Sequence, residues 1–403
     1  MSNSALGFHT FSISKRLTLK EAKRLFNDFH NYQNVSIIPE KILKPSKNTN
    51  GSGIQLDYMR PSYLNIVYPH QKKGIKWCLS CSPVLPHYLC YDKRYENKTC
   101  SIQATINPKI FTGINDYITA ANETCLNDVA TAFNQEAKRI SPILGECSSY
   151  QFNRIDYCVN FDLKELNMKC SPQRMMELIK RGDIPANYKL YTDYSQTSHR
   201  NIPKEYSFYL VSKSATINIY WKWYQLQKKF PDCSDMDNAL NVIRFEVQYK
   251  YPKIHNMSKQ MFCGFSPYMN STRQGILSKE TAENVISNYF RKVIHSGIYY
   301  TLQKARNIIE SRGFHNNKEK RLISTLTLIN RCRGIAKAKE TLKEDQLVDF
   351  RRSLRELDNL GINPVTIPKE WNIKYVPNLF FERERRVGKE IFYEKMIYKT
   401  SGK

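Results

Sequence analysis

The chain has 403 residues, of which 41% are hydrophobic and 12% aromatic, so it is too apolar for a disordered protein and can bury a substantial core. Its 62 Lys and Arg residues against 37 acidic ones leave a net charge of +25, which indicates a polyanionic partner. Nucleic acid is the leading candidate, because basic side chains that neutralise phosphates release condensed counterions, and an anionic membrane is the weaker alternative.

The chain shows no sign of membrane insertion or secretion. No apolar run approaches the roughly 18 residues of a membrane span, and the first twenty residues lack the apolar core of a signal peptide. The eleven cysteines are odd in number and scattered, so they do not resemble a disulfide framework and suit a reducing compartment. The sequence therefore predicts a cytoplasmic protein.

Up to about residue 265, strand-like and helix-like patterns follow the same series twice. In the first series, the expected elements are a strand, a helix and three strands over 7–14, 17–29, 62–69, 74–81 and 100–111. In the second they cover 154–163, 171–182, 205–212, 215–223 and 241–254. Two related units, about 1–145 and 146–265, are therefore expected. Each would contribute to an antiparallel sheet with helices on one face, which is an α+β fold.

From Ser278 onward the pattern is almost continuously helical. Turn formers gather over 263–275, which predicts a boundary there. Ser278 is expected to cap a first helix, a second is expected over 321–333, and a third over 343–360, with Gly361 as its stop. The expected organisation is one domain over 1–265 and a mostly helical C-terminal domain over 266–403.

Three strands of the second unit alternate apolar and polar residues with a period of two, which places the two kinds on opposite faces. If the strands share one sheet, its apolar face packs in the core and its polar face is open. The residues expected on that open face are Arg154, Asp156, Tyr220, Lys222, Arg244 and Glu246.

This set of side chains suits phosphoryl transfer. Asp156 and Glu246 could hold a divalent cation, Mg²⁺ or Mn²⁺, and Tyr220 could attack phosphorus to form a phosphotyrosine that preserves the energy of the broken bond. The metal and Lys222 would lower the phenol pKa from about 10. The plainer alternative is a solvated sheet face on which Arg-x-Asp and Arg-x-Glu form cross-strand ion pairs.

The order of three short motifs, "RID" at 154–156, "IYWK" at 219–222 and "RFE" at 244–246, resembles the gene II type replication initiators of filamentous phages and their relatives on plasmids of low-GC bacteria. The tail segment "LGINPVTIPKEW" with the later "VPNLF" extends the resemblance, which covers about 60–380. Such initiators nick one strand of a supercoiled origin, stay on the 5′ phosphate through tyrosine, and later rejoin the strand. The resemblance implies Tyr220 as nucleophile, Lys222 beside it, and Asp156 and Glu246 as the acidic positions.

The sequence departs from the wider group of rolling-circle nickases because it has no His-hydrophobic-His triplet. A metal would have to rely on carboxylates and a distant histidine, such as His199 or His255, although a surface histidine without a metal role is the plainer reading of each. Tyr224 is a conceivable second nucleophile. On a regular strand it would share the face of Tyr220, whereas a bulge or a helix would divert it.

The predicted function is therefore a metal-dependent, site-specific DNA endonuclease and strand transferase that starts rolling-circle replication in the cytoplasm of a bacterial host. The domain over 1–265 would cut and the helical one would bind DNA, with Arg154, Lys213 and Arg244 as DNA contacts. The expected partners are the supercoiled origin, the displaced strand and a host helicase, whereas no membrane partner is expected and the oligomeric state is left open. The alternatives are a conjugative relaxase with the same chemistry and a nonenzymatic nucleic-acid binder that stacks bases on Tyr157, Trp223 or Tyr224.

Overall fold

The computed structural model describes residues 6–32, 35–39, 63–67, 73–81, 100–190, 206–233, 235–261 and 275–386. Within them, a ten-stranded antiparallel sheet runs in the order β2-β3-β4-β5-β1-β6-β10-β9-β8-β7. The strands before residue 110 are β1 (Leu6–Leu17), β2 (Ser36–Pro39), β3 (Tyr63–Val67), β4 (Ile75–Cys81) and β5 (Cys100–Ile106). Those after residue 150 are β6 (Gln151–Asp162), β7 (Lys189–Leu190), β8 (Ser207–Val211), β9 (Ala215–Trp221) and β10 (Val242–Lys250).

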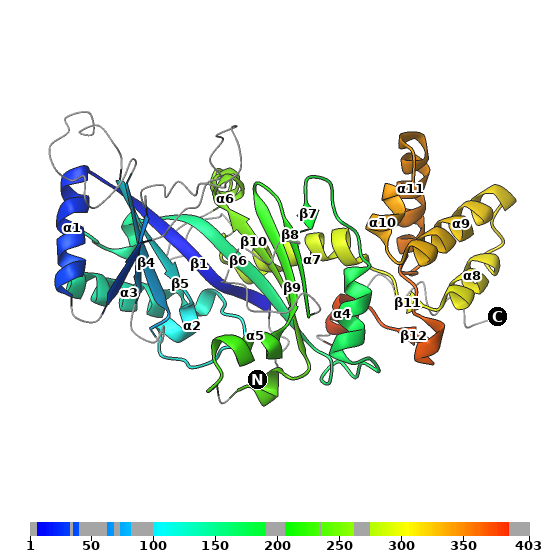
Figure 1. Ribbon diagram of the computed structural model, residues 1–403, viewed down its shortest axis with the longest axis horizontal. Coiled ribbons are helices and arrows are strands. Elements are labelled where there is room, and N and C mark those ends of the chain that lie inside the picture. The colour runs from blue at the N-terminus through cyan, green and yellow to red at the C-terminus, as the bar shows by residue number, and fades with distance from the viewer. Residues whose placement is uncertain are drawn as a thin grey trace, which may run out of the picture.

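The strand order is symmetric about the central β1–β6 pair (Figure 1). Outward from this pair, the order is β1, β5, β4, β3 and β2 on one side and β6, β10, β9, β8 and β7 on the other. Each side therefore places the first strand of its set of five at the centre and the second at the edge. Helix α1 (Leu19–Asn31) follows β1, and helix α4 (Pro172–Lys180) occupies the same place after β6. The repeated series seen in the sequence therefore corresponds to a repeated order of strands in space.

Helices α1, α3 (Leu126–Ile140), α4 and α7 (Lys279–Ile294) are among those that pack on the apolar face of the sheet. Their buried side chains, such as Leu25, Phe133, Met175 and Ile286, join a single hydrophobic core with the inward residues of the strands. Burial of this apolar surface is the main stabilising term for the sheet. The prediction of an α+β fold built on an antiparallel sheet is confirmed. The expectation of helices on one face is wrong in part, because helix α5 (Lys222–Lys229) packs on the opposite face.

Prolines end two strands earlier than the sequence pattern predicts. The expected strand over 100–111 stops at Ile106, and Pro108 begins the short helix α2 (Pro108–Phe111). The expected strand over 241–254 stops at Lys250, and Pro252 lies in the first turn of α6 (Tyr251–Ser258). Proline lacks the N–H that a strand ladder needs, and its fixed φ suits the first turn of a helix.

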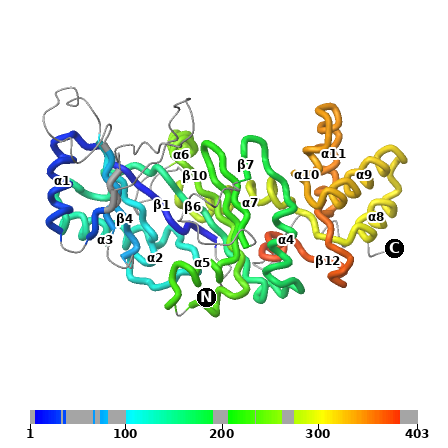
Figure 2. Tube along the Cα trace, in the orientation of Figure 1, coloured from blue at the N-terminus to red at the C-terminus, as the bar shows by residue number. Residues whose placement is uncertain are grey.

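The C-terminal region is largely helical, as predicted. Figures 1 and 2 show α8–α11 gathered beyond the β7 end of the sheet. The first predicted helix is α7, whose cap Ser278 accepts a hydrogen bond from the Thr281 N–H. The other elements are α8 (Leu302–Glu310), α9 (Asn316–Cys332), α10 (Ile335–Glu340), α11 (Glu344–Asn359), α12 (Leu379–Arg386), and the β11 (Tyr299–Tyr300) and β12 (Tyr375–Val376) pair. Gly361 follows α11 with a φ of 71°, a left-handed conformation that favours glycine.

The predicted boundary between the two domains stays a prediction. Helix α7 follows that boundary in sequence, yet it packs on β1, β6 and β10. Among the residues given above, no helix is both long and apolar enough to cross a membrane. Seven of the described cysteines are free, whereas Cys100 is disulfide-bonded.

Candidate functional site

The strand register brings Arg154, Asp156, Tyr220, Arg244 and Glu246 to one face of the sheet, whereas Lys222, predicted on the same strand as Tyr220, lies beyond the end of β9. Tyr220 on β9 lies opposite Arg244 on β10. Glu246, two positions along β10, lies between Asn218 of β9 and Cys158 of β6. The apolar residues that alternate with them belong to the hydrophobic core on the opposite face, as predicted. A charged cluster therefore spans three adjacent strands.

The expectation that this face is open is wrong at its centre. Tyr220 is 1% exposed, Arg244 0%, Asp156 1% and Lys222 1%. Helix α5 (Lys222–Lys229) and the short helix η6 (Asp237–Ala239) form a small apolar cluster of their own on this side. It consists of Ile118, Leu226, Ala239 and Val242, with Tyr117, Trp223, Phe230 and Cys233 packed against it. Alternation identified the face but not the chain segments that cover it.

The Tyr220 hydroxyl donates a hydrogen bond to Oε2 of Glu246 over 3.3 Å. Burial and the neighbouring Glu246 hold the pKa of Tyr220 well above its ordinary value, so the phenol is neutral. Burial and the nearby Asp156 also raise the pKa of Glu246. A carboxylate with a raised pKa next to a phenol is a better proton acceptor than an ordinary surface glutamate.

Arg244 joins the sheet to the segment that covers it. Its Nε donates to Oδ1 of Asn160 over 2.8 Å, and its Nη2 donates to the carbonyl of Ile118. The amide of Asn160 donates to the same carbonyl over 2.6 Å. Nη1 of Arg244 is buried and has no hydrogen-bond partner within the described part of the chain. Arg244 is thus enclosed within the protein, although its assignment as a DNA contact required an open face.

Arg154 and Asp156 form an ion pair. The guanidinium of Arg154 binds both carboxylate oxygens, with Nε–Oδ1 and Nη2–Oδ2 distances of 2.9 and 2.6 Å. The side-chain amide of Gln248 donates to Oδ1 over 3.0 Å. The plainer reading of the Arg-x-Asp motif predicted an ion pair between strands, whereas this pair lies within β6. Arg154 is half-buried at the margin of the cluster.

These contacts do not fit a divalent metal held by Asp156 and Glu246. Both oxygens of Asp156 are already engaged, and Arg154 would have to move before a cation could bind there. Burial raises the pKa of the intervening Cys158 to about 11, so its thiol is protonated and is a poor metal ligand. No group of three or more metal-binding side chains occurs among the residues that the structure describes.

Lys222 begins helix α5 directly after β9. Its Nζ donates to Oε1 of Gln225 over 2.5 Å, and burial together with nearby Arg244 holds its pKa well below the ordinary value. The start of this helix also diverts Tyr224 from the face of Tyr220, one of the two outcomes left open. The Tyr224 ring stacks on Tyr206, with a centroid distance of 4.0 Å.

His9 belongs to this region, although the sequence reasoning missed it. It lies at an irregularity in the β1–β6 pairing between Phe8 and Thr10. Phe8 and Phe11 are both fully buried despite a spacing of three, which a regular strand cannot place on one face. That spacing was the available signal for a bulge. Burial and four neighbouring cations, Arg244, Lys222, Lys229 and Arg154, hold the pKa of His9 well below its ordinary value.

The depressed pKa of His9 predicts a pH dependence of stability. The unfolded chain takes up a proton at His9 as the pH falls through about 6.5, whereas the folded protein does not. The free energy of unfolding should therefore decrease below that pH. Urea unfolding at several pH values should show a shallower decrease in His9→Gln than in the wild type. His255→Gln, which alters an exposed histidine on α6, is the control and should keep the wild-type slope.

Other predicted residues lie apart from the cluster. Lys213 is exposed in the turn between β8 and β9, whereas Tyr220 lies near the opposite end of β9. His255 is exposed and stacks on Tyr251. His199 lies outside the described residues. Tyr157, expected to stack on bases in the nonenzymatic reading, is fully buried in the core, and its hydroxyl donates to the carbonyl of Ile276 over 2.8 Å.

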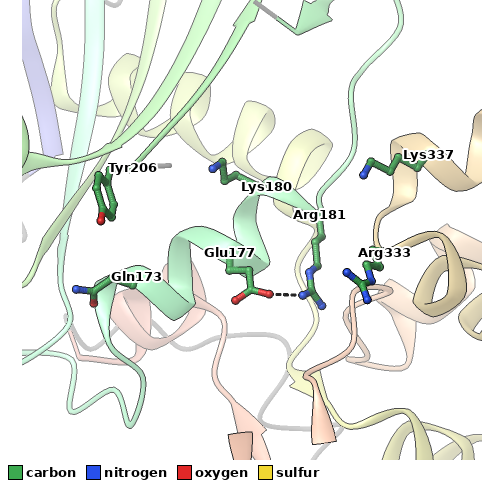
Figure 3. A pocket seen from close by; sticks show the side chains of 7 residues that line it. All are labelled: Gln173, Glu177, Lys180, Arg181, Tyr206, Arg333 and Lys337. Carbon is green, nitrogen blue, oxygen red and sulfur yellow. Dashed lines mark hydrogen bonds and ion pairs between the residues drawn. The ribbon is translucent and has the colours of Figure 1, made fainter. Parts of the chain in front are cut away.

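A basic hollow of about 470 Å³ lies where helix α4 meets the C-terminal helices (Figure 3). Lys180 and Arg181 at the end of α4, Arg333 directly after α9 and Lys337 in α10 line it, and Tyr206 lies at its far side. Glu177 is the acidic residue of this lining, and it is paired with Arg181. The backbone N–H of Ile335 donates to the Arg181 carbonyl over 2.9 Å, which joins the two regions here.

Comparison with known proteins adds no relative to this picture. None of the protein-family models matches the chain, and none of the curated proteins does. The functional assignment therefore depends on the residues and their geometry. The most informative feature is a buried tyrosine that is hydrogen-bonded to a glutamate and surrounded by cations on the polar face of the sheet.

Proposed function

We propose that this protein cleaves and rejoins a DNA strand through Tyr220, as the resemblance to rolling-circle replication initiators implies. The observation that carries the proposal is the hydrogen bond from the Tyr220 hydroxyl to Glu246, with Arg244 and Lys222 beside it. This arrangement supplies a nucleophile, a proton acceptor, a positive charge for the phosphate from Arg244 and a proton donor for the leaving group from Lys222. The net charge of +25 supports a nucleic-acid substrate.

In the proposed step, the Tyr220 oxygen attacks a backbone phosphorus and forms a phosphotyrosine on the 5′ side, while the bond to the 3′ oxygen breaks. Glu246 accepts the phenol proton. Lys222, with its depressed pKa, gives a proton to the departing 3′ oxygen. Nη1 of Arg244, which is buried and has no hydrogen-bond partner among the described residues, is a donor for the charge that develops on the phosphate. Rejoining reverses these transfers.

The proposal routes no step through a metal. Binding of Mg²⁺ or Mn²⁺ at Asp156 and Glu246 remains a prediction. The Arg154 guanidinium opposes it, because the ion would have to displace that group from Asp156. Replication of a plasmid or phage and conjugative transfer would use the same residues. They differ in the DNA beside the gene rather than in the site, so the relaxase alternative shares this chemistry.

We infer that the sheet consists of two related units and that the second carries the reaction. The symmetric strand order about β1 and β6 supports the duplication. Gln103 and Thr105 of the first unit take the places that Arg244 and Glu246 hold in the second, since β5 and β10 have equivalent positions in the sheet. The first unit would then act as scaffold and DNA-binding surface, and the helical region as a second DNA-binding surface.

One observation favours a nonenzymatic nucleic-acid binder as the second candidate. Tyr220 is 1% exposed, so a strand can reach its hydroxyl only if the covering segment that includes α5 moves away. The half-buried, stacked rings of Tyr206 and Tyr224 lie nearer the surface and could contact bases without such movement.

The test is an assay for a covalent adduct. The protein is mixed with supercoiled plasmid that carries the DNA flanking its own gene, with Mg²⁺, Mn²⁺ or chelator, and the products are separated under denaturing conditions. The proposed function predicts nicked DNA with protein attached, and mass spectrometry should find a nucleotide on Tyr220. Glu246→Gln should slow the reaction by about 10²–10⁴-fold. Binding without nick or adduct under every condition would favour the nonenzymatic candidate.

A further inference from the structure

A basic cavity of about 770 Å³ lies beside the Tyr220 cluster, at the junction of the two sets of strands. The first set contributes His9 and Lys76, and the second contributes Arg154. The start and end of helix α5 contribute the largest share of the charge, from Lys222, Lys228 and Lys229. A cavity of this size is in the range that holds a nucleotide-sized ligand.

Most of the positive charge in this cavity is not paired with a carboxylate, the exception being Arg154, which is paired with Asp156. None of the described residues that line it is a carboxylate. Lys76, Lys222, Lys228 and Lys229 form no ion pair with an acidic side chain in the described ranges, and Lys222 is 1% exposed. Lys76, Lys228 and Lys229 are exposed, so solvent screens part of their mutual repulsion, and an anion in the cavity would be attracted to all three. The depressed pKa of His9 is consistent with the positive potential there.

The remaining lining is suited to a nucleotide rather than to a bare anion. Thr10, Thr105 and Asn107 provide neutral hydrogen-bonding groups on one side. Tyr117 packs on Phe230 on another, with ring centroids 4.4 Å apart, and supplies an aromatic wall for a base. Side chains that bind phosphate and an aromatic ring that stacks on a base, within one cavity, are typical of a site for single-stranded nucleic acid.

We propose that this cavity binds a nucleotide of a DNA strand, with the phosphate on the α5 lysines and the base against Tyr117. The site does not require Tyr220 to be a nucleophile, because a nonenzymatic binder would use it in the same way. It therefore goes beyond the proposed reaction, and binding measurements in a Tyr220→Phe background test it separately from cleavage.

The test compares two double variants with equal loss of charge. Lys228→Gln with Lys229→Gln removes cavity charge, and Lys138→Gln with Lys164→Gln removes two exposed lysines elsewhere. Binding of a fluorescent oligothymidylate is measured by anisotropy over a range of KCl concentrations. The cavity variant should bind about tenfold more weakly. The magnitude of its slope of log K against log salt should decrease by about 1.4, because each of the two lost phosphate contacts contributes about 0.7. The control should change less than about twofold. Equal effects in both variants would overturn the proposal, because they would indicate diffuse charge.

A second measurement distinguishes a strand from a free nucleotide. The ring signals of His9, assigned by comparison with His9→Gln, are followed by NMR during titration with oligothymidylate or with thymidine monophosphate. Oligothymidylate should shift these signals in the parent protein, and in the cavity variant the same shift should require about tenfold more oligothymidylate. Saturation of the signals by the mononucleotide, with no response to oligothymidylate, would show a small-molecule site and overturn the proposal.

Discussion

Replacing Tyr220 with phenylalanine is expected to abolish the covalent adduct while preserving DNA binding. Loss of a nucleophile that acts together with its base typically lowers the rate by several orders of magnitude, and we expect a decrease of at least about 10³-fold here. The ring itself stays in place, since phenylalanine keeps the packing and loses only the hydroxyl that donates to Glu246. The measurements are adduct formation and oligonucleotide affinity on the same preparation.

Tyr224→Phe is the matched control for this variant. It removes a hydroxyl four residues away, from a ring that stacks on Tyr206 rather than from the charged cluster. Its adduct yield should stay close to that of the wild type. If Tyr220→Phe still forms the adduct and Tyr224→Phe does not, the nucleophile is Tyr224, and the geometry around Glu246 has a structural role instead.

Replacing Arg244 with methionine is expected to destabilise the protein by about 3–5 kcal/mol, because it removes one partner of a buried charged network. Arg244 is 0% exposed, and its guanidinium binds Asn160 and the Ile118 carbonyl. Without it, the amide oxygen of Asn160 loses its hydrogen-bond donor. Glu246 also loses the cation that contributes most to lowering its pKa. Urea unfolding followed by tryptophan fluorescence measures the change.

Two further variants serve as comparisons for the Arg244→Met unfolding measurement. Arg312→Met changes an exposed arginine and should alter the free energy of unfolding by less than about 0.5 kcal/mol. Lys222→Met should keep or increase stability, because the lysine is buried and its ammonium is bonded to Gln225 without a carboxylate partner. A stability loss in Lys222→Met as large as that in Arg244→Met would contradict this account of the cluster.

The predicted fold and the predicted site depended on different kinds of information. Alternation in 154–159, 217–221 and 243–248 identified which side chains share a face, and the register confirms it. The same alternation could not show whether other segments cover the polar face, because α5 and the segment around Ile118 reach that face through tertiary packing. His9 was missed because period-two counting fails at a bulge, although the spacing of Phe8 and Phe11 indicated one.

The amino-acid pattern was sufficient for the α+β class, the repeated series of elements, the helical C-terminal region and the sides of the strands. These features follow from local periodicity, caps and turn residues, each of which acts over a few positions. The burial of Tyr220 and the cavity between the two sets of strands were decided by the tertiary structure alone. They arise from contacts between residues that lie far apart in the chain or from the solvent that such contacts exclude, and periodicity does not report either.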